Sequence, residues 1–157
     1  MTDLAFRVLY RCAYRAMRVY WAVFHPRAHG ALVAVWHGGE VLLVHTSYAA
    51  YYQFPGGYVR RGETGAEAAS REVLEELGLR VEPGALVPVA DVEHVWEGKR
   101  ERVEIFELSP PGRPSVEIDD REVVDARFVA PEQALQLALF PPVREVIERR
   151  ARAELAR

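Results

Sequence analysis

The sequence contains almost no cysteine and no long hydrophobic run. Cys12 is the one cysteine among 157 residues, which excludes an internal disulfide framework and a zinc site built on cysteines. No stretch of 18 uncharged apolar residues occurs, so we expect no ordinary transmembrane helix. A secretory signal pattern is not evident either, and we therefore expect a cytoplasmic protein.

A strong charge of either sign is also missing. The net charge of −3 argues against a protein whose main task is to hold nucleic acid. Half of the residues are hydrophobic, which is too large a share for a disordered chain. The length suits a single domain with a packed core.

Charge is unevenly divided between two parts of the chain. Residues 1–29 hold five arginines and one acid, a net +4, while the other 128 residues hold 15 bases and 22 acids, a net −7. Such asymmetry indicates parts with different roles. We therefore divide the chain into a basic arm, residues 1–28, and a folded domain, residues 29–157.

The arm is predicted to form an amphipathic helix over residues 4–24. Four arginines recur at helical spacing and share one face: Arg7, Arg11, Arg15 and Arg18. The helix would pack on the domain or on a second copy in a homodimer, with its arginine edge in solvent. Alternatively, residues 4–24 would lie on an anionic membrane surface. We expect removal of residues 1–25 to leave the chemistry of the domain intact.

The remainder mixes strands with helices. Strands are predicted at residues 31–36, 41–46, 86–95, 102–108 and 126–129, and helices at 64–77, from 131, and from about 142 onward. The helix at 64–77 is the clearest, because Thr64 and Glu67 form a capping box and Gly78 is a typical C-terminal stop. This order predicts an α/β or α+β sandwich.

The polar side of that helix carries clustered carboxylates. Glu72, Glu75 and Glu76 share one face, where like charges repel by a few tenths of a kcal/mol per pair. A divalent cation would reverse that repulsion, and carboxylate oxygens suit Mg²⁺ or Mn²⁺. Arg71 lies four residues before Glu75 and can orient a carboxylate by hydrogen bonding.

A glycine turn precedes the helix. Gly56 and Gly57 let backbone N–H groups approach a phosphate closely, and Glu63 follows six residues after Gly57. Together with the carboxylates, the turn predicts a site for a metal-bound polyphosphate.

The spacing of these residues resembles the Nudix box. Residues 57–79 meet every position of G-x5-E-x7-R-E-U-x-E-E-x-G-U, where U is a bulky aliphatic residue. The likeness extends over about residues 29–150, and it implies an α/β/α sandwich with a mixed central sheet, to which the arm adds an N-terminal helix.

The resemblance implies a hydrolase that uses Mg²⁺, or Mn²⁺ in its place, to cleave the diphosphate linkage of a nucleoside diphosphate attached to another group. By this resemblance Glu72, Glu75 and Glu76 are metal ligands, with Glu76 the principal one. Glu63 assists metal binding or orientation, and Arg71 keeps the glutamates in line. The substrate stays unassigned, because substrate choice lies outside the box.

The general base is not specified by the motif. Glu122 is our candidate, because it precedes the strand at 126–129 in a downstream acidic segment, the region where the family often places it. Rival acids are Glu117, Asp119 and Asp120, with Glu101 and Glu104 weaker.

Other residues and other functions stay open. His45 or His94 would touch a ligand or serve the structure, and four aromatics would stack on a base or pack: Tyr51, Tyr52, Phe54 and Trp96. The alternatives to a hydrolase are a non-catalytic nucleotide-binding sensor on the same fold and an isomerase of prenyl diphosphates.

Overall fold

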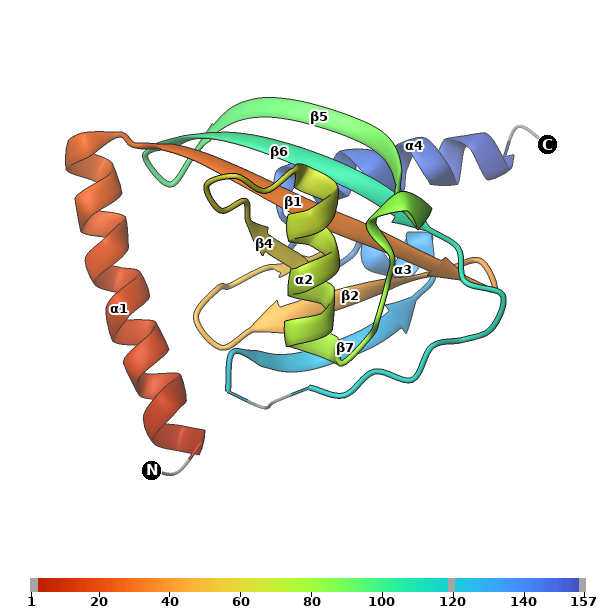
Figure 1. Ribbon diagram of the computed structural model, residues 1–157, viewed down its shortest axis with the longest axis horizontal. Coiled ribbons are helices and arrows are strands. Elements are labelled where there is room, and N and C mark those ends of the chain that lie inside the picture. The colour runs from red at the N-terminus through yellow and green to blue at the C-terminus, as the bar shows by residue number, and fades with distance from the viewer. Residues whose placement is uncertain (1–2, 119–120, 156–157) are drawn as a thin grey trace.

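The computed structural model describes residues 3–118 and 121–155 (Figure 1). Its helices are α1 (Asp3–Phe24), α2 (Gly65–Leu77), α3 (Pro131–Ala134) and α4 (Pro141–Leu155), with a short 3₁₀ turn at Pro83–Ala85. Its strands are β1 (Arg27–His37), β2 (Glu40–Thr46), β3 (Tyr52–Gln53), β4 (Gly56–Tyr58), β5 (Val87–Trp96), β6 (Lys99–Leu108) and β7 (Val123–Val129).

These strands form one mixed sheet centred on β1. The order is β3-β2-β1-β6-β5, with β4 also paired to β1 and β7 to β2. Strand β1 runs parallel to β6 from Arg27 to Val35, and it pairs antiparallel with β2 through the hairpin at its end. The parallel pairing explains why β1 begins four residues before the predicted strand: its polar first residues are held by β6.

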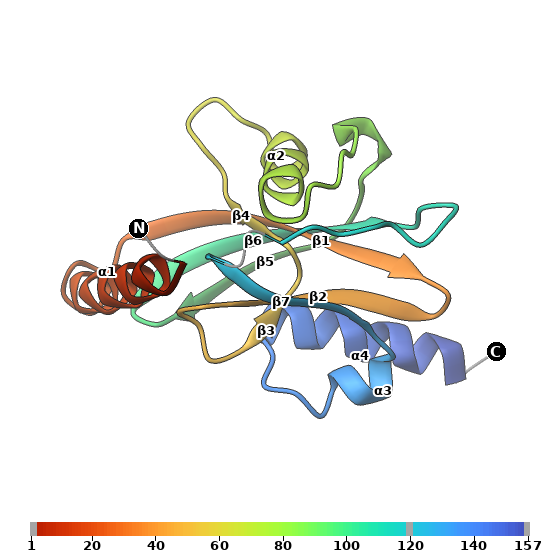
Figure 2. The same cartoon turned by 90° about the horizontal axis from the view of Figure 1, so that it is seen from below.

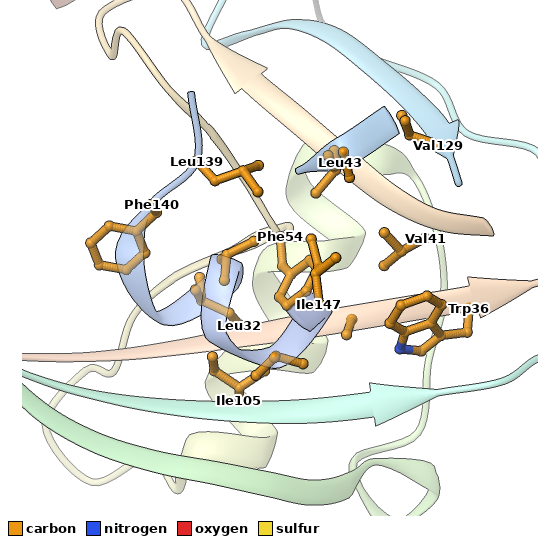
Figure 3. Close-up of a cluster of buried hydrophobic side chains, with 14 of the residues drawn as sticks. Leu32, Trp36, Val41, Leu43, Phe54, Ile105, Val129, Leu139, Phe140 and Ile147 are labelled. Atoms are coloured by element: carbon orange, nitrogen blue, oxygen red, sulfur yellow. The ribbon is translucent and has the colours of Figure 1, made fainter. Parts of the chain in front are cut away.

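Helices cover both faces of the sheet. Figure 2 shows α2 on one face and α3 with α4 on the other, which confirms the predicted α/β/α sandwich. Strand β1 serves both cores, because successive side chains point to opposite faces. Leu32 and Trp36 lie in the core beneath α4 (Figure 3) together with Ala34, while Ala31 and Val33 lie in the core beneath α2.

Local signals position α2. Thr64 accepts a hydrogen bond from the Glu67 backbone and the Glu67 side chain accepts one from the Thr64 backbone, so the capping box is complete. Gly78 ends the helix in the left-handed conformation, with φ 65°. Ala69, Val73 and Leu77 recur at helical spacing and are fully buried, so they form the apolar face of α2.

Helix α1 stands at one side of the sandwich (Figure 1). Among its described side chains Trp21 is the buried one, and its outward face exposes apolar residues such as Leu9, Val19 and Val23. The helix packs on the domain, and its arginine edge takes part: Arg11 donates to the Ser47 carbonyl, 2.8 Å away. None of the helices in the described part of the chain carries an apolar stretch that would cross a bilayer. Contact with a second copy or with a membrane surface stays a prediction.

Candidate functional site

The glycine turn before α2 is built by sterics. Gly56 has φ 139°, and a Cβ there would lie 2.2 Å from the Ala31 carbonyl oxygen. A Cβ on Gly57 would lie 2.6 Å from the carboxyl carbon of Glu72. The two glycines therefore bring β4 against both the central strand and the carboxylates of α2. A side chain at Gly56 would clash with the β1 backbone, and one at Gly57 would displace the Glu72 carboxylate.

The carboxylates of α2 and this turn line one cavity of about 440 Å³, a size usual for small-molecule sites. Glu72, Glu75 and Glu76 belong to its lining, as do Gly56 and Gly57. Glu76 is oriented by the turn itself, because the Gly56 N–H donates to Glu76 Oε2 at 2.9 Å.

Arg71 joins the carboxylates from beside the cavity. Its guanidinium donates to both oxygens of Glu63, at 2.8 and 3.0 Å, to Glu72 and to the Tyr58 carbonyl. The bond from Arg71, followed by one from the Arg60 N–H, lowers the pKa of Glu63 to about 2. The bond to Glu63 in turn raises the pKa of Arg71. This is the geometry of a clamp that fixes Glu72, with Glu63 holding the clamp in place.

Glu122, the residue directly before β7, reaches the cavity. Its Oε1 accepts a hydrogen bond from the Tyr48 hydroxyl at 2.9 Å, and both residues line the cavity. Burial and the adjacent charge of Glu122 raise the pKa of Tyr48, so the phenol stays a donor. The structure thus brings Glu122 together with the carboxylates of α2.

The rival acids are placed differently. Glu101 lines the cavity but is bound to Lys99 Nζ at 3.1 Å. Glu104 lies against Gly65 and contacts His29 Nε2 at 2.5 Å. Glu117 lies near Gly78 and is not in the cavity lining. Asp119 and Asp120 fall outside the described residues.

Of the aromatic candidates, Tyr51 lines the cavity. Phe54 is fully buried in the core, Trp96 packs on Tyr51 at 5.8 Å between ring centroids, and the Tyr52 hydroxyl donates to Asp125. Neither predicted histidine lines this cavity: the ring centroid of His45 lies 4.9 Å from that of Tyr52, and that of His94 lies 5.2 Å from that of Phe140.

Sequence reasoning missed several residues that line the cavity: Tyr14, Tyr48, Arg60, Lys99 and Phe140. One signal for Tyr14 was present. Aromatics at positions 6, 10, 14 and 21 recur at helical spacing, which predicts a second face of the arm besides its arginine edge.

The described acidic, histidine and cysteine side chains include no group of three already converged on a metal position. The donor chemistry nevertheless fits a hard divalent cation, since four carboxylates line the cavity besides the Lys99-bound Glu101: Glu72, Glu75, Glu76 and Glu122. Rotation of these side chains is needed to bring their oxygens to one ion.

Comparison with known proteins identifies the family. The NUDIX domain model matches residues 25–150, and the chain therefore belongs to the Nudix hydrolase family, as the motif predicts. The matched region contains both hydrophobic cores and every residue that lines the cavity except Tyr14 of α1.

Solved structures share the fold. A MutT Nudix hydrolase from Burkholderia pseudomallei has a TM-score of 0.69 and 21% identity, covering 78% of this chain and 96% of that one. The E. coli dihydroneopterin triphosphate pyrophosphohydrolase has a TM-score of 0.67 and 23% identity, covering 80% and 95%. A bifunctional NMN adenylyltransferase/ADP ribose pyrophosphatase from Francisella tularensis, in complex with AMP and a manganese ion, has a TM-score of 0.64 and 18% identity, covering 93% and 47%.

Proposed function

We propose that this chain is a metal-dependent pyrophosphohydrolase that cleaves the diphosphate linkage of a nucleoside diphosphate attached to another group. The observation that carries this proposal is the meeting of the Gly56–Gly57 turn with Glu72, Glu75, Glu76 and Glu122 in one cavity. Neither a phosphate-binding turn nor a set of carboxylates would suffice alone. Family membership supports the same reaction class.

Glu72, Glu75 and Glu76 would hold Mg²⁺ or Mn²⁺, with Glu76 the principal ligand and Glu63 assisting from beside them. The bound ion would neutralise the developing charge on the bridging and non-bridging phosphate oxygens. The manganese ion in the Francisella relative supports this choice of metal. Arg71 serves the site by keeping Glu72 in position, since its guanidinium contacts Glu63 and Glu72 together.

The remaining chemistry is assigned to this chain's own groups. The glycine turn lets the substrate's phosphates approach the backbone without a side chain between them. Glu122 accepts a proton from the attacking water as the new P–O bond forms and the bridging P–O bond breaks. A base in this role needs hydrogen-bond reach of the water, and Glu122 faces the same cavity as the α2 carboxylates.

A direct assay tests the proposal. The chain is incubated with Mg²⁺ and, in turn, with nucleoside triphosphates, sugar nucleotides, ADP-ribose and dinucleoside polyphosphates, with chelated samples beside each. We expect phosphate-containing products from at least one class, and none with the chelator. Tight nucleotide binding without turnover by the wild type would instead identify a sensor and overturn the proposal.

A variant pair makes the assay specific to the cavity. Glu76→Gln should abolish turnover, because it removes the charge of the principal ligand. Glu132→Gln is the matched control, since Glu132 is an exposed glutamate of α3 outside the cavity lining. Equal rates in the two variants would show that hydrolysis does not depend on the α2 carboxylates.

A further inference from the structure

Helix α1 contributes to the cavity although it ends at Phe24, before the region that matches the family begins at residue 25. Tyr14, in the middle of α1, lines the same cavity as Glu76 and Glu122. We infer that α1 is a wall of the active site, and that Tyr14 and Tyr48 are positioning residues that hold Glu122 in place. This inference rests on the proposed function, and it reverses the expectation that the arm is dispensable.

The route from the helix to the base is a chain of three side chains. The Tyr14 ring lies against the Tyr48 ring, with centroids 4.9 Å apart. The Tyr48 hydroxyl donates to Glu122 Oε1 at 2.9 Å. Tyr10, one turn earlier on α1, also faces Tyr48, at 6.2 Å between centroids. The direction of the Tyr48 hydroxyl is therefore set by rings that α1 supplies.

The backbone around Tyr48 is fixed by the same neighbours. The Ser47 N–H donates to the Glu122 carbonyl at 2.7 Å, and the Ser47 carbonyl accepts from Arg11 of α1 at 2.8 Å. One short loop therefore connects the helix to the segment that carries Glu122, through side-chain and main-chain contacts together.

The C-terminal end of α1 packs against the turn between β5 and β6. Trp21 is buried, with Lys99 Nζ 4.4 Å from its ring centroid. A Cβ on Gly98 would lie 3.0 Å from the Ala22 Cα, so helix and turn are in close backbone contact. The Tyr14 hydroxyl donates to Glu97 of this turn. Because its middle contacts the loop that carries Tyr48 and its C-terminal end contacts this turn, α1 behaves as part of the scaffold.

The position of the general base controls the reaction rate, because a displacement of a catalytic group by about 1 Å can slow a reaction by about 100-fold. Removing the Tyr14 ring frees Tyr48 to rotate, and Glu122 then loses the hydrogen bond from the Tyr48 hydroxyl. The metal-binding carboxylates of α2 are untouched by that change. The defect should therefore appear in kcat and not in KM.

The test uses variants of the full chain on the substrate found in the panel above. Tyr14→Ala should lower kcat by about 10- to 100-fold, with KM within about twofold of the wild-type value. Tyr14→Phe keeps the ring, so its kcat should stay close to that of the wild type. The kcat of Tyr48→Phe should fall as far as that of Tyr14→Ala. The kcat of the variant with both substitutions should fall no further, because both act through one hydrogen bond. Tyr20→Ala is the matched control, since Tyr20 is an exposed tyrosine of the same helix.

Wild-type kcat in a folded Tyr14→Ala variant would overturn the inference, and so would a loss in Tyr14→Phe equal to that in Tyr14→Ala. Should Tyr14→Ala not fold, Tyr14→Leu takes its place. If the wild type hydrolyses no substrate, the proposed function fails separately. A crystal structure of Tyr14→Ala then decides: a displaced Tyr48 hydroxyl supports positioning by α1, and an unchanged Tyr48–Glu122 bond refutes it.

Discussion

Replacing Gly57 by alanine should disable the site while leaving the fold intact. The added Cβ would lie 2.6 Å from the carboxyl carbon of Glu72 and 2.8 and 2.9 Å from its two oxygens. Ordinary contact begins at 3.4 Å, so the carboxylate must retreat by about 0.8 Å, the difference between the two distances. Glu72 is also bonded to Arg71, so this retreat loosens the clamp as well.

A misplacement of this size predicts a loss in kcat of about 100-fold, which corresponds to about 2.7 kcal/mol of transition-state stabilisation. The crowding itself should lower the free energy of unfolding by less than about 1 kcal/mol, because the displaced atoms are the far end of the flexible Glu72 side chain. Measurements of kcat with Mg²⁺, of Mn²⁺ affinity by electron paramagnetic resonance, and of thermal unfolding separate the two effects.

Gly38→Ala provides a control that is destabilised at least as much. Gly38 has φ 61°, and a Cβ added there would have nothing within 4 Å, so alanine strains the backbone by about 1–2 kcal/mol far from the cavity lining. That variant should keep the wild-type kcat. A Gly57→Ala protein with unchanged kcat and unchanged Mn²⁺ affinity would refute the steric reasoning.

Three further predictions concern the carboxylates and the core. Glu76→Gln should melt near the wild-type temperature, because the glutamine oxygen can still accept the bond from the Gly56 N–H; a large drop in melting temperature would contradict this. Arg71→Ala should lower the free energy of unfolding by about 1–3 kcal/mol in chelator and by less in Mg²⁺, which replaces the lost positive charge; equal losses in both buffers would argue against a metal at these carboxylates. Burial lowers the pKa of His94 below its usual 6.5. As the pH falls, the histidine of the unfolded chain therefore takes up its proton before that of the folded chain. The free energy of unfolding then decreases as the pH falls from 6.5 through the lowered pKa. Chemical denaturation between pH 8 and 5 should show that slope in the wild type and a weaker one in His94→Phe; identical slopes would exclude the histidine.

Much of the candidate site was predictable because the interactions that form α2 and its acidic face act between residues close in the sequence. Helix α2 begins at the Thr64 capping box and ends at Gly78, as predicted, since capping and helical periodicity depend on neighbours within one or two turns. The same periodicity placed Glu72, Glu75 and Glu76 on one face. Short elements such as β3 and β4 were missed, because two or three residues carry too little pattern and are held by pairing with β2 and β1.

The amino-acid sequence alone thus determined the family, the sandwich architecture and the acidic face of α2, all of which follow from local spacing. Tertiary structure alone decided which distant groups join that face. Tyr14, Tyr48 and Glu122 come from three separate segments. The acidic segment pointed to Glu122 and the helical spacing of aromatics to a second face of the arm, but no local pattern indicates that the three residues meet. They meet because β7 pairs with β2 and because α1 is tied to the turn between β5 and β6, contacts that form only when the whole sheet is assembled.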